Sequence, residues 1–457
     1  MRYLLFGTGD CYERYRGWFI REEVVALIDN AVSKQNRKKD GWDVLSPEEG
    51  IRQNYDAIVI LSFYVETMRN QLLGMGVERE KIFHFYDLHK LINVKNRKKT
   101  VQYYGNFDIC SGNGKILLLN QNLAVGGPAF TLFDMAKILK RNGYHVVYGS
   151  MLDGPLKNNL LEEDIPVVVD ENLLIGTMED IEWISDYELV VCNAINFYVF
   201  LSKRDCSIPI IWWLHDSEFF YQGVDKNVIT KILPENLSIF SVGPIPERAI
   251  KKYLQNMKVN TLLYGVNDKL SEDKKDYGSD KIVFTTIGFV ESRKGQDILI
   301  NAIKMIPLSL RKRAKFYIIG KNTSLLAKKI NEDIENMPEI VMTGMVKDVH
   351  VYLNQTNVLI CPSREDPMPA VAAEAMMHEI PCILSDETGT AAYIEQGEDG
   401  FVFSSGRVEE LKERIIWCIE NFNKLHEIGK KARCVYETNF SMDVFEKNLV
   451  KIIEGII

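Results

Sequence analysis

The chain has 457 residues, of which 46% are hydrophobic and 26% charged, with a formal net charge of −8. This length exceeds one ordinary domain and can hold three. The acidic balance argues against general nucleic-acid binding, because such proteins need cations against the phosphate backbone. The sequence predicts neither a membrane span, which needs a run of about 18 apolar residues, nor a signal peptide.

The pattern of cysteines indicates the cellular compartment of the protein. The eight cysteines are scattered and none forms a Cys-x-x-Cys pair, so we expect reduced core thiols in a cytosolic protein and no zinc site. They are Cys11, Cys110, Cys192, Cys206, Cys361, Cys382, Cys418 and Cys434.

The first hundred residues alternate expected strands and helices, which predicts a small parallel-sheet domain over 1–100. Gly7 and Gly9 follow the first strand, and Asp29 ends the second, about twenty residues on. This spacing is similar to a dinucleotide-binding fingerprint, although Tyr12 occupies the third glycine position. A nucleotide site and a purely structural or docking role both remain open. The expected strands are 2–6, 24–28, 56–61 and 82–85, with a helix over 11–21.

Basic residues gather in three places despite the acidic average. The clusters span 34–39 and 90–99, and a predicted helix over 246–258 adds a third. Either these are solvated faces, or they attract an anionic bilayer at the inner face of the cell membrane. The cations of the last two are Lys95, Arg97, Lys98 and Lys99, and Arg248, Lys251, Lys252 and Lys258.

The region 111–275 begins with an expected strand at 115–120, followed by Gly126 and Gly127 and an amphipathic helix. Glycines permit close backbone approach to a ligand, but a Gly-Gly pair is also a common turn. A later apolar strand ends at His215, where a neutral imidazole oriented by Asp216 could bond a hydroxyl or phosphate of a ligand. The alternative is an imidazole satisfied by the loop backbone.

Metal chemistry finds little support in the sequence. The acids Asp186 and Glu188 precede the strand expected at 189–192, whereas a metal-binding Asp-x-Asp motif should end a strand. We interpret them as turn residues and predict no metal site.

Two cations follow the strand expected at 281–287. Gly288 ends this strand, and Arg293 and Lys294 precede an amphipathic helix. The order strand, loop, helix places both cations at the carboxyl edge of a parallel sheet, where α/β sheets bind ligands. Their charges suit a diphosphate and could stabilise it as it leaves. Two solvated loop cations are the alternative.

Two acidic residues, Asp366 and Glu374, lie on either side of the predicted start of a helix that follows the apolar strand 358–361. We expect Pro369 at the first helical position, with the amides of Ala370, Val371 and Ala372 free to bind an anion. Asp366 lies before this helix and Glu374 within it, so the two could meet different parts of one ligand. A helix cap and a solvated glutamate are the alternative.

These motifs, in this order, resemble retaining GT-B glycosyltransferases of family 4, the glycosyl transferases group 1 type. The resemblance implies that Glu374 binds the ribose of a nucleotide sugar and that Asp366, rather than Glu365, reaches the sugar. It implies catalytic or positioning roles for His215, Arg293 and Lys294. It further implies donor contacts from Gly126, Gly127, Gly288, Gly320, Thr343, Gly344, Met368, Pro369, Ala370 and Val371.

The implied architecture is α/β: two facing Rossmann-type lobes preceded by the small Rossmann-like domain. The acceptor lobe would span 111–275 and the donor lobe 276–440, and a C-terminal helix in 441–457 would pack back toward the first lobe. The implied activity is cofactor-free transfer from a UDP-sugar to a glycan or lipid-linked acceptor in surface polysaccharide synthesis. A sugar-nucleotide 2-epimerase or a non-catalytic nucleotide-sugar-binding assembly protein are the alternatives.

Overall fold

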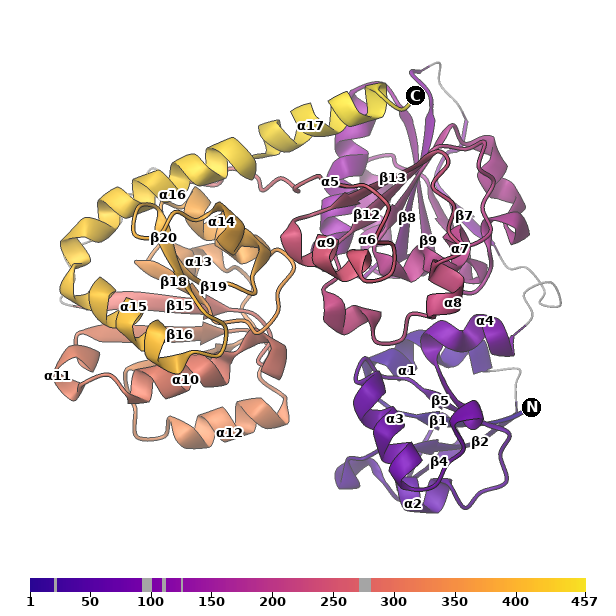
Figure 1. The fold of residues 1–457 in the computed structure, drawn as a ribbon, viewed down its shortest axis with the longest axis horizontal. Coiled ribbons are helices and arrows are strands. Elements are labelled where there is room, and N and C mark those ends of the chain that lie inside the picture. The colour runs from indigo at the N-terminus through magenta and orange to yellow at the C-terminus, as the bar shows by residue number, and fades with distance from the viewer. Residues whose placement is uncertain (20–22, 93–100, 109–111, 125, 271–280) are drawn as a thin grey trace. The chain divides into compact units, whose positions relative to one another are not determined.

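The computed structural model describes residues 1–19, 23–92, 101–108, 112–124, 126–270 and 281–457 (Figure 1). Cys110 and the basic run 95–99 lie outside these residues. The chain forms two compact units. The first comprises residues 1–212, 218–238 and 251–257, and the second comprises 213–217, 239–250 and 258–457.

The N-terminal residues form a six-stranded sheet in the order β3-β4-β2-β1-β5-β6. Its strands run parallel except for the β3–β4 hairpin. The helix predicted over 11–21 is wrong at residues 16–19: α1 (Asp10–Tyr15) gives way there to a 3₁₀ turn at Arg16–Phe19, because Gly17 disfavours further α-helix. Residues 20 and 21 of the prediction lie outside the described residues. The remaining elements are β1 (Arg2–Phe6), β2 (Glu23–Ile28), β3 (Arg37–Lys39), β4 (Trp42–Leu45), α2 (Pro47–Gly50), β5 (Ala57–Ile60), α3 (Val65–Gly74), β6 (Ile82–His84) and α4 (Leu88–Leu91).

The next sheet has eight strands in the order β14-β13-β12-β11-β8-β9-β10-β7. Strand β7 pairs antiparallel with β10, whereas β8 pairs parallel with β9 and β11. The strands are β7 (Gln102–Tyr104), β8 (Lys115–Asn122), β9 (His145–Leu152), β10 (Val167–Val169), β11 (Leu189–Asn193), β12 (Ile210–Leu214), β13 (Leu237–Ser241) and β14 (Val259–Thr261). The helices are α5 (Gly127–Arg141), α6 (Leu156–Glu162), α7 (Tyr198–Leu201), α8 (Lys226–Ile229) and α9 (Pro244–Lys251).

The helix predicted over 246–258 is wrong in its second half, because α9 ends at Lys251. The chain turns there so that Tyr253 stacks on Tyr221, with ring centroids 5.6 Å apart, and donates its hydroxyl to the Tyr221 carbonyl at 3.2 Å. A continued helix would have to give up this buried contact.

The third sheet is wholly parallel, in the order β17-β16-β15-β18-β19-β20. Its strands are β15 (Ile282–Ile287), β16 (Ala314–Ile319), β17 (Ile340–Gly344), β18 (Val358–Cys361), β19 (Cys382–Ser385) and β20 (Gly400–Phe403). The helices are α10 (Gln296–Lys304), α11 (Leu308–Arg311), α12 (Leu325–Asp333), α13 (His350–Leu353), α14 (Ala370–Met377), α15 (Val408–Glu420) and α16 (Leu425–Asn439).

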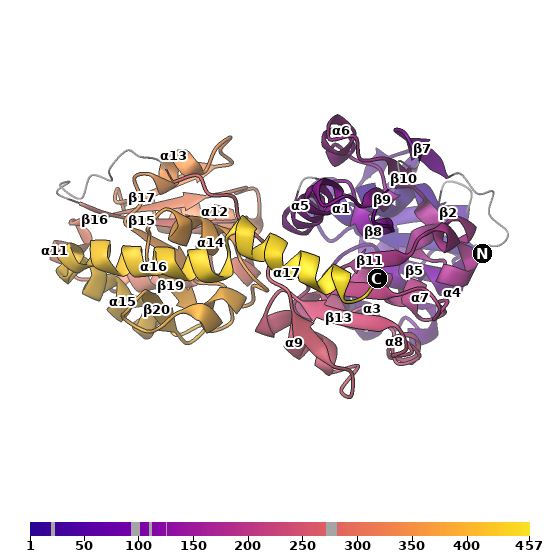
Figure 2. The same cartoon turned by 90° about the horizontal axis from the view of Figure 1, so that it is seen from above.

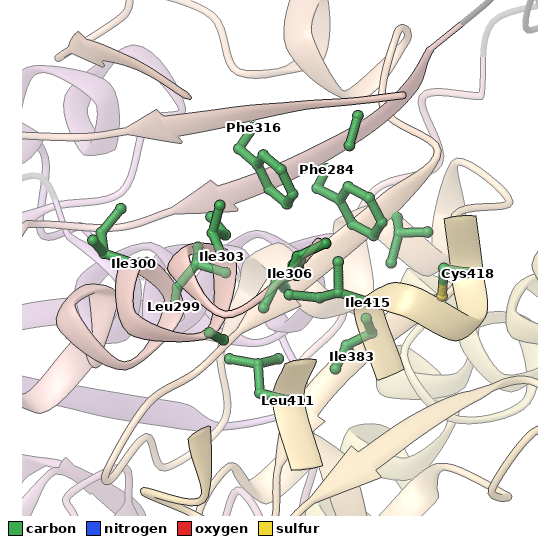
Figure 3. Close-up of a cluster of buried hydrophobic side chains, with 14 of the residues drawn as sticks. Phe284, Leu299, Ile300, Ile303, Ile306, Phe316, Ile383, Leu411, Ile415 and Cys418 are labelled. Atoms are coloured by element: carbon green, nitrogen blue, oxygen red, sulfur yellow. The ribbon is translucent and has the colours of Figure 1, made fainter. Parts of the chain in front are cut away.

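One face of this sheet rests on a continuous apolar core (Figure 3). Phe284 of β15 stacks on Phe316 of β16, with ring centroids 5.0 Å apart. Ile303 of α10 and Ile415 of α15 cover them, and both are fully buried. This packing fixes the strands in place, and the candidate site lies at their carboxyl ends.

The last helix, α17 (Met442–Glu454), lies within the predicted range and follows α16 directly (Figure 2). The Ser441 hydroxyl caps it by accepting from the Val444 amide at 3.4 Å. Phe445 on α17 stacks against Trp213 at the end of β12, with ring centroids 5.8 Å apart. Among the helices of the described ranges, none is both long and apolar enough to cross a bilayer.

Candidate functional site

The loops after β15 and β18 meet at the carboxyl edge of the third sheet. Gly295 ends the first loop in the left-handed conformation, with φ of 69°. A Cβ atom at Gly295 would lie 2.0 Å from the carbonyl oxygen of Pro362, in the second loop. Only glycine fits there, so the two loops are in direct backbone contact.

This contact brings Lys294 to Asp366. The Lys294 Nζ donates to Asp366 Oδ2 at 2.5 Å, and the Asp366 side chain is only 8% exposed. Backbone hydrogen bonds to Glu387 and from Gly389, both at 2.9 Å, hold Asp366 in place. The sequence-predicted cation and acid, 72 residues apart, therefore form one charge pair.

The charge pair lines a small cavity at the sheet edge. Thr286, Gln296 and Val371 line it as well. The hydroxyl of Thr286 is buried and has no partner among the described residues. The cavity thus combines a cation, a carboxylate and an available hydroxyl.

Arg293 lies differently from Lys294. Its guanidinium donates to the Glu291 carboxylate at 2.8 Å and to the Glu365 carbonyl at 3.1 Å. Arg364, in the loop after β18, makes a second clamp through a bidentate bond to Asp297 in the first turn of α10, at 2.6 and 2.9 Å. In this structure Arg293 braces the loops, and its predicted pairing with a diphosphate stays a prediction.

Helix α14 begins at Ala370, one residue later than predicted. Pro369 is its N-cap, with φ of −66° and ψ of 114°. The prediction of three free amides is wrong at Ala372, whose N–H donates to the Pro369 carbonyl at 3.0 Å. Ala370 and Val371 occupy the first two helical positions, whose amides have no acceptor inside a helix, so they point donors and positive dipole at the loop before them.

Tyr264 anchors this helix start. Its buried hydroxyl donates to the Met368 carbonyl at 2.8 Å. Burial raises the pKa of Tyr264 well above its usual value, and the nearby acids Asp366 and Glu374 raise it further. Tyr264 is therefore a neutral hydrogen-bond donor under the influence of both predicted ligand-binding carboxylates.

Glu374 lies half-buried on α14, and no described residue donates a hydrogen bond to its carboxylate. Burial raises the pKa of this carboxyl, and the charge of Lys269 opposes the rise. An acid that is desolvated but not hydrogen-bonded is unusual in a folded protein. It is suited to accept hydrogen bonds from a ligand.

The ends of two further strands, β16 and β17, meet the end of β15 beside this site. A Cβ atom at Gly320 would lie 2.0 Å from the carbonyl oxygen of Gly288, and both glycines have positive φ. The amide of Gly320 donates to the carbonyl of Gly344 at 2.9 Å, and the Thr343 hydroxyl donates to the same oxygen at 3.0 Å. The predicted donor-binding glycines of β15, β16 and β17 are thus one cluster, and the apolar side chain of Phe289 is exposed next to it.

The predicted residues of the eight-stranded sheet also lie at strand ends. Gly126 and Gly127 are exposed at the start of α5, and a Cβ atom at either would meet nothing within 4 Å. His215 follows β12, packs against Trp213 and is buried, and its Nε2 has no partner among the described residues. Burial lowers the pKa of His215 to about 3, so its imidazole is neutral.

The candidate N-terminal site is already occupied by the protein itself. Asp29 accepts from the Thr8 amide at 3.0 Å, the Thr8 hydroxyl at 2.5 Å, the Ala31 amide at 2.9 Å and Lys34 at 3.1 Å. Gly7 has φ of 106° and faces Leu61, whose carbonyl oxygen a Cβ atom would approach to 2.7 Å. The glycine and the acid here have structural partners.

The basic residues of α9 and the turn after it are likewise engaged. Arg248 makes a bidentate ion pair with Glu387. Lys251 donates to the Met257 carbonyl at 2.7 Å, and Lys252 pairs with Glu218 at 2.5 Å. These contacts favour a solvated, ion-paired face over a bilayer-binding one.

Sequence reasoning missed Tyr264, Thr286, Gln296 and Gly389. Gly295 could have been read as the left-handed residue that joins the loops, because it directly follows Lys294 at a helix start. Tyr264 carries no such signal, since its partner is a backbone carbonyl 104 residues away.

Comparisons with known proteins bear on the family and the fold. Residues 268–435 match the family model "Glycosyl transferases group 1", and residues 1–83 match "C2185-like, N-terminal". The capsular polysaccharide biosynthesis glycosyltransferase CapM of Staphylococcus aureus is 27% identical over 187 residues, 40% of this chain and 48% of CapM. A UDP-Gal:α-D-GlcNAc-diphosphoundecaprenol α-1,3-galactosyltransferase of Escherichia coli is 23% identical over 177 residues, 36% of this chain and 46% of that enzyme. The chain thus spans about half the length of these two relatives.

A solved structure extends the similarity to the fold. HepE of Anabaena in complex with UDP-glucose superposes with a TM-score of 0.64 at 19% identity, over 75% of this chain and all of that chain. This protein therefore has the GT-B fold, and its residues 268–435, here named the group 1 region, match the glycosyl transferases group 1 family model.

Proposed function

We propose that this protein is a glycosyltransferase that moves a sugar from a UDP-sugar to a glycan or lipid-linked acceptor in surface polysaccharide synthesis, with retention of anomeric configuration. The observation that carries the donor assignment is the Lys294–Asp366 pair in the loops before α14, together with Glu374 on that helix, whose carboxylate accepts no hydrogen bond from the described residues. CapM and the E. coli galactosyltransferase support the pathway and the acceptor class, and the UDP-glucose complex of HepE supports the nucleotide.

Each residue has a role that follows from its chemistry. Glu374 would accept hydrogen bonds from the ribose hydroxyls. Lys294 and the first amides of α14 would hold the diphosphate, and Asp366 would bond a sugar hydroxyl. The neutral imidazole of His215 would bond the transferred sugar or the phosphate. The extra N-terminal sheet is proposed to be a Rossmann-like module that binds no nucleotide at Asp29, because that carboxylate already has four donors.

The chemical step balances without a protein nucleophile. The bond between the anomeric carbon and the diphosphate oxygen breaks, and a bond to the acceptor oxygen forms on the same face of the sugar. The acceptor proton passes to the departing diphosphate, whose negative charge Lys294 stabilises as it develops. The products are a glycoside and UDP, and no metal or organic cofactor is proposed to take part.

The test is to incubate the protein with labelled UDP-sugars, with and without a bacterial glycolipid fraction. Labelled glycolipid together with released UDP is the expected result, and NMR of the new glycosidic bond should show the anomeric configuration of the donor. Conversion of the UDP-sugar into a different UDP-sugar without acceptor would instead establish an epimerase. Inversion at the anomeric carbon would contradict the retaining step alone.

A further inference from the structure

The N-terminal domain, residues 1–92, packs against the eight-stranded sheet within the first compact unit. Tyr15 of this domain accepts a hydrogen bond from Gln121 Nε2 at 2.5 Å, at the carboxyl end of β8. The hydroxyl of Tyr198, after β11, donates to the Tyr86 carbonyl at 3.4 Å. The contacted segments therefore follow strand ends at the carboxyl edge, where α/β sheets bind ligands.

Further contacts involve the segment after β12, residues 218–225. Phe220 packs edge-on against Phe63, and Phe219 against Tyr64, each with ring centroids 5.6 Å apart. These aromatic pairs join the loop after β5 to a segment that starts three residues after His215 in the chain. Tyr64 remains 53% exposed, so part of this aromatic surface faces solvent.

The far end of the same segment is held by charge. Lys90 donates to Asp87 of its own domain at 2.8 Å and pairs with Asp225 at 2.6 Å. Both carboxylates are largely buried, at 11% and 13% exposure. One lysine thus links the domain to the start of α8.

Between these two anchors the backbone itself touches the N-terminal domain. The ring of His84 is fully buried against Gly223, and a Cβ atom at Gly223 would lie 1.6 Å from His84 Cε1. Burial lowers the pKa of His84 to about 3, so the contact is between a neutral ring and bare backbone. This fit leaves no room for any side chain at position 223.

We propose that the N-terminal domain is the acceptor-side specificity element of the enzyme: it fixes the conformation of residues 218–225 and adds the Phe63–Tyr64 edge to the surface that receives the acceptor. This inference rests on the proposed glycosyl transfer. It assigns Gly223, His84 and Lys90 as positioning residues, while the donor site on the third sheet is independent of them.

The test is the substitution Gly223→Ala in the full-length protein, with Gly74→Ala as the matched control, because a Cβ atom at Gly74 would meet nothing within 4 Å. Three quantities are measured: the acceptor KM in the glycolipid assay, the rate of UDP release without acceptor, and hydrogen exchange of residues 218–225. Gly223→Ala should raise the acceptor KM about 10- to 100-fold, as small misplacements at a reacting site do. UDP release and donor KM should stay within about twofold of wild type.

A double-mutant cycle distinguishes a specific clash between position 223 and His84 from general misfolding of Gly223→Ala. His84→Ala removes the ring that clashes with the new methyl, so Gly223→Ala/His84→Ala should recover part of the lost acceptor affinity. If Gly223→Ala shows faster hydrogen exchange in residues 218–225 but an unchanged acceptor KM, the domain has a purely structural role and the proposal is overturned. Unchanged hydrogen exchange in this segment would overturn it as well. Equal loss of acceptor transfer and of acceptor-independent UDP release would overturn it too. If wild type transfers no sugar, the proposed function fails, while exchange still decides whether the domain holds this segment.

Discussion

The N-terminal sheet and the group 1 region use the same local design, a parallel strand, a glycine-containing loop and a helix, with an acid near the strand ends. They differ in what their acids bond. Asp29 accepts hydrogen bonds from Thr8, Ala31 and Lys34, whereas Glu374 accepts none from the described residues.

The pKa values report this difference. Burial alone would raise the pKa of Asp29, but the hydrogen bonds outweigh it and the pKa lies below its usual value. Burial raises the pKa of Glu374, and only Lys269 opposes it. A buried carboxylate that accepts hydrogen bonds from the protein, such as Asp29, stabilises the fold. A buried carboxylate without such donors, such as Glu374, is available to a ligand.

The largest effect is expected from Lys294→Ala. Removing this cation should lower kcat by about 10²- to 10³-fold, as loss of one charge-stabilising donor does. The measurement is UDP release at saturating donor, with circular dichroism as the check on folding. Lys304→Ala is the matched control, because Lys304 also forms an ion pair, with Asp333 at 3.3 Å, but on an exposed surface where such pairs contribute little. A kcat within about twofold of wild type would contradict the diphosphate role.

Glu374→Ala should weaken donor binding. Hydrogen bonds to charged groups contribute about 1.5–3 kcal/mol each, so loss of the ribose contacts should raise the Kd for UDP at least about tenfold. Calorimetric titration with UDP measures this directly. The same titration of Asp29→Asn should match wild type, since that acid serves its own loop. Weaker UDP binding in Asp29→Asn, or unchanged binding in Glu374→Ala, would reverse the assignment of the two acids.

Asp29→Asn should instead destabilise the N-terminal domain, by about 1–3 kcal/mol at pH 7, because a neutral amide cannot accept from all the donors that Asp29 satisfies. The folded pKa of Asp29 lies below its usual value of 3.8, so its contribution is complete above that pH and is lost as pH falls through the folded pKa. Urea unfolding measures the free energy of unfolding of variant and wild type at pH 7 and at acid pH. The difference between the two free energies should be smaller at acid pH. A difference that persists at low pH would contradict the hydrogen-bond explanation.

The smallest effect, with the opposite sign, is expected for Glu374→Gln. The folded pKa of Glu374 lies above its usual value of 4.5, so the charged carboxylate weighs against folding at neutral pH. The amide should therefore raise Tm slightly at pH 7. This gain should fade as pH falls through the folded pKa, where the wild-type side chain is itself neutral. A lower Tm at pH 7 would mean that the carboxylate has a partner in the protein.

The sequence was most informative where a residue type can serve few purposes. Lys294 and Asp366 could be singled out because charges at strand ends of a parallel sheet have few structural uses, and the structure brings the two together, whereas Glu374 lies within α14 and was singled out by its spacing from Asp366 and the resemblance that this spacing carries. It was least informative about ends of helices, as α9 and α1 show, because a tertiary contact such as Tyr253 on Tyr221 outweighs local helix preference. The donor and catalytic roles of these residues remain predictions.

What the sequence determined by itself is the order of strands and helices and the positions of His215, Lys294 and Asp366 after strands. These follow from local periodicity, which depends on residues close in the chain. The GT-B class follows from the resemblance of the motifs to a known family. Only the tertiary structure decided which acid is satisfied, that Arg293 bonds Glu291, and that His84 closes on Gly223. Each of those outcomes depends on the atoms of another residue lying within about 4 Å in the folded chain. Such a contact produces no periodic pattern in the sequence, so it could not be predicted from the sequence.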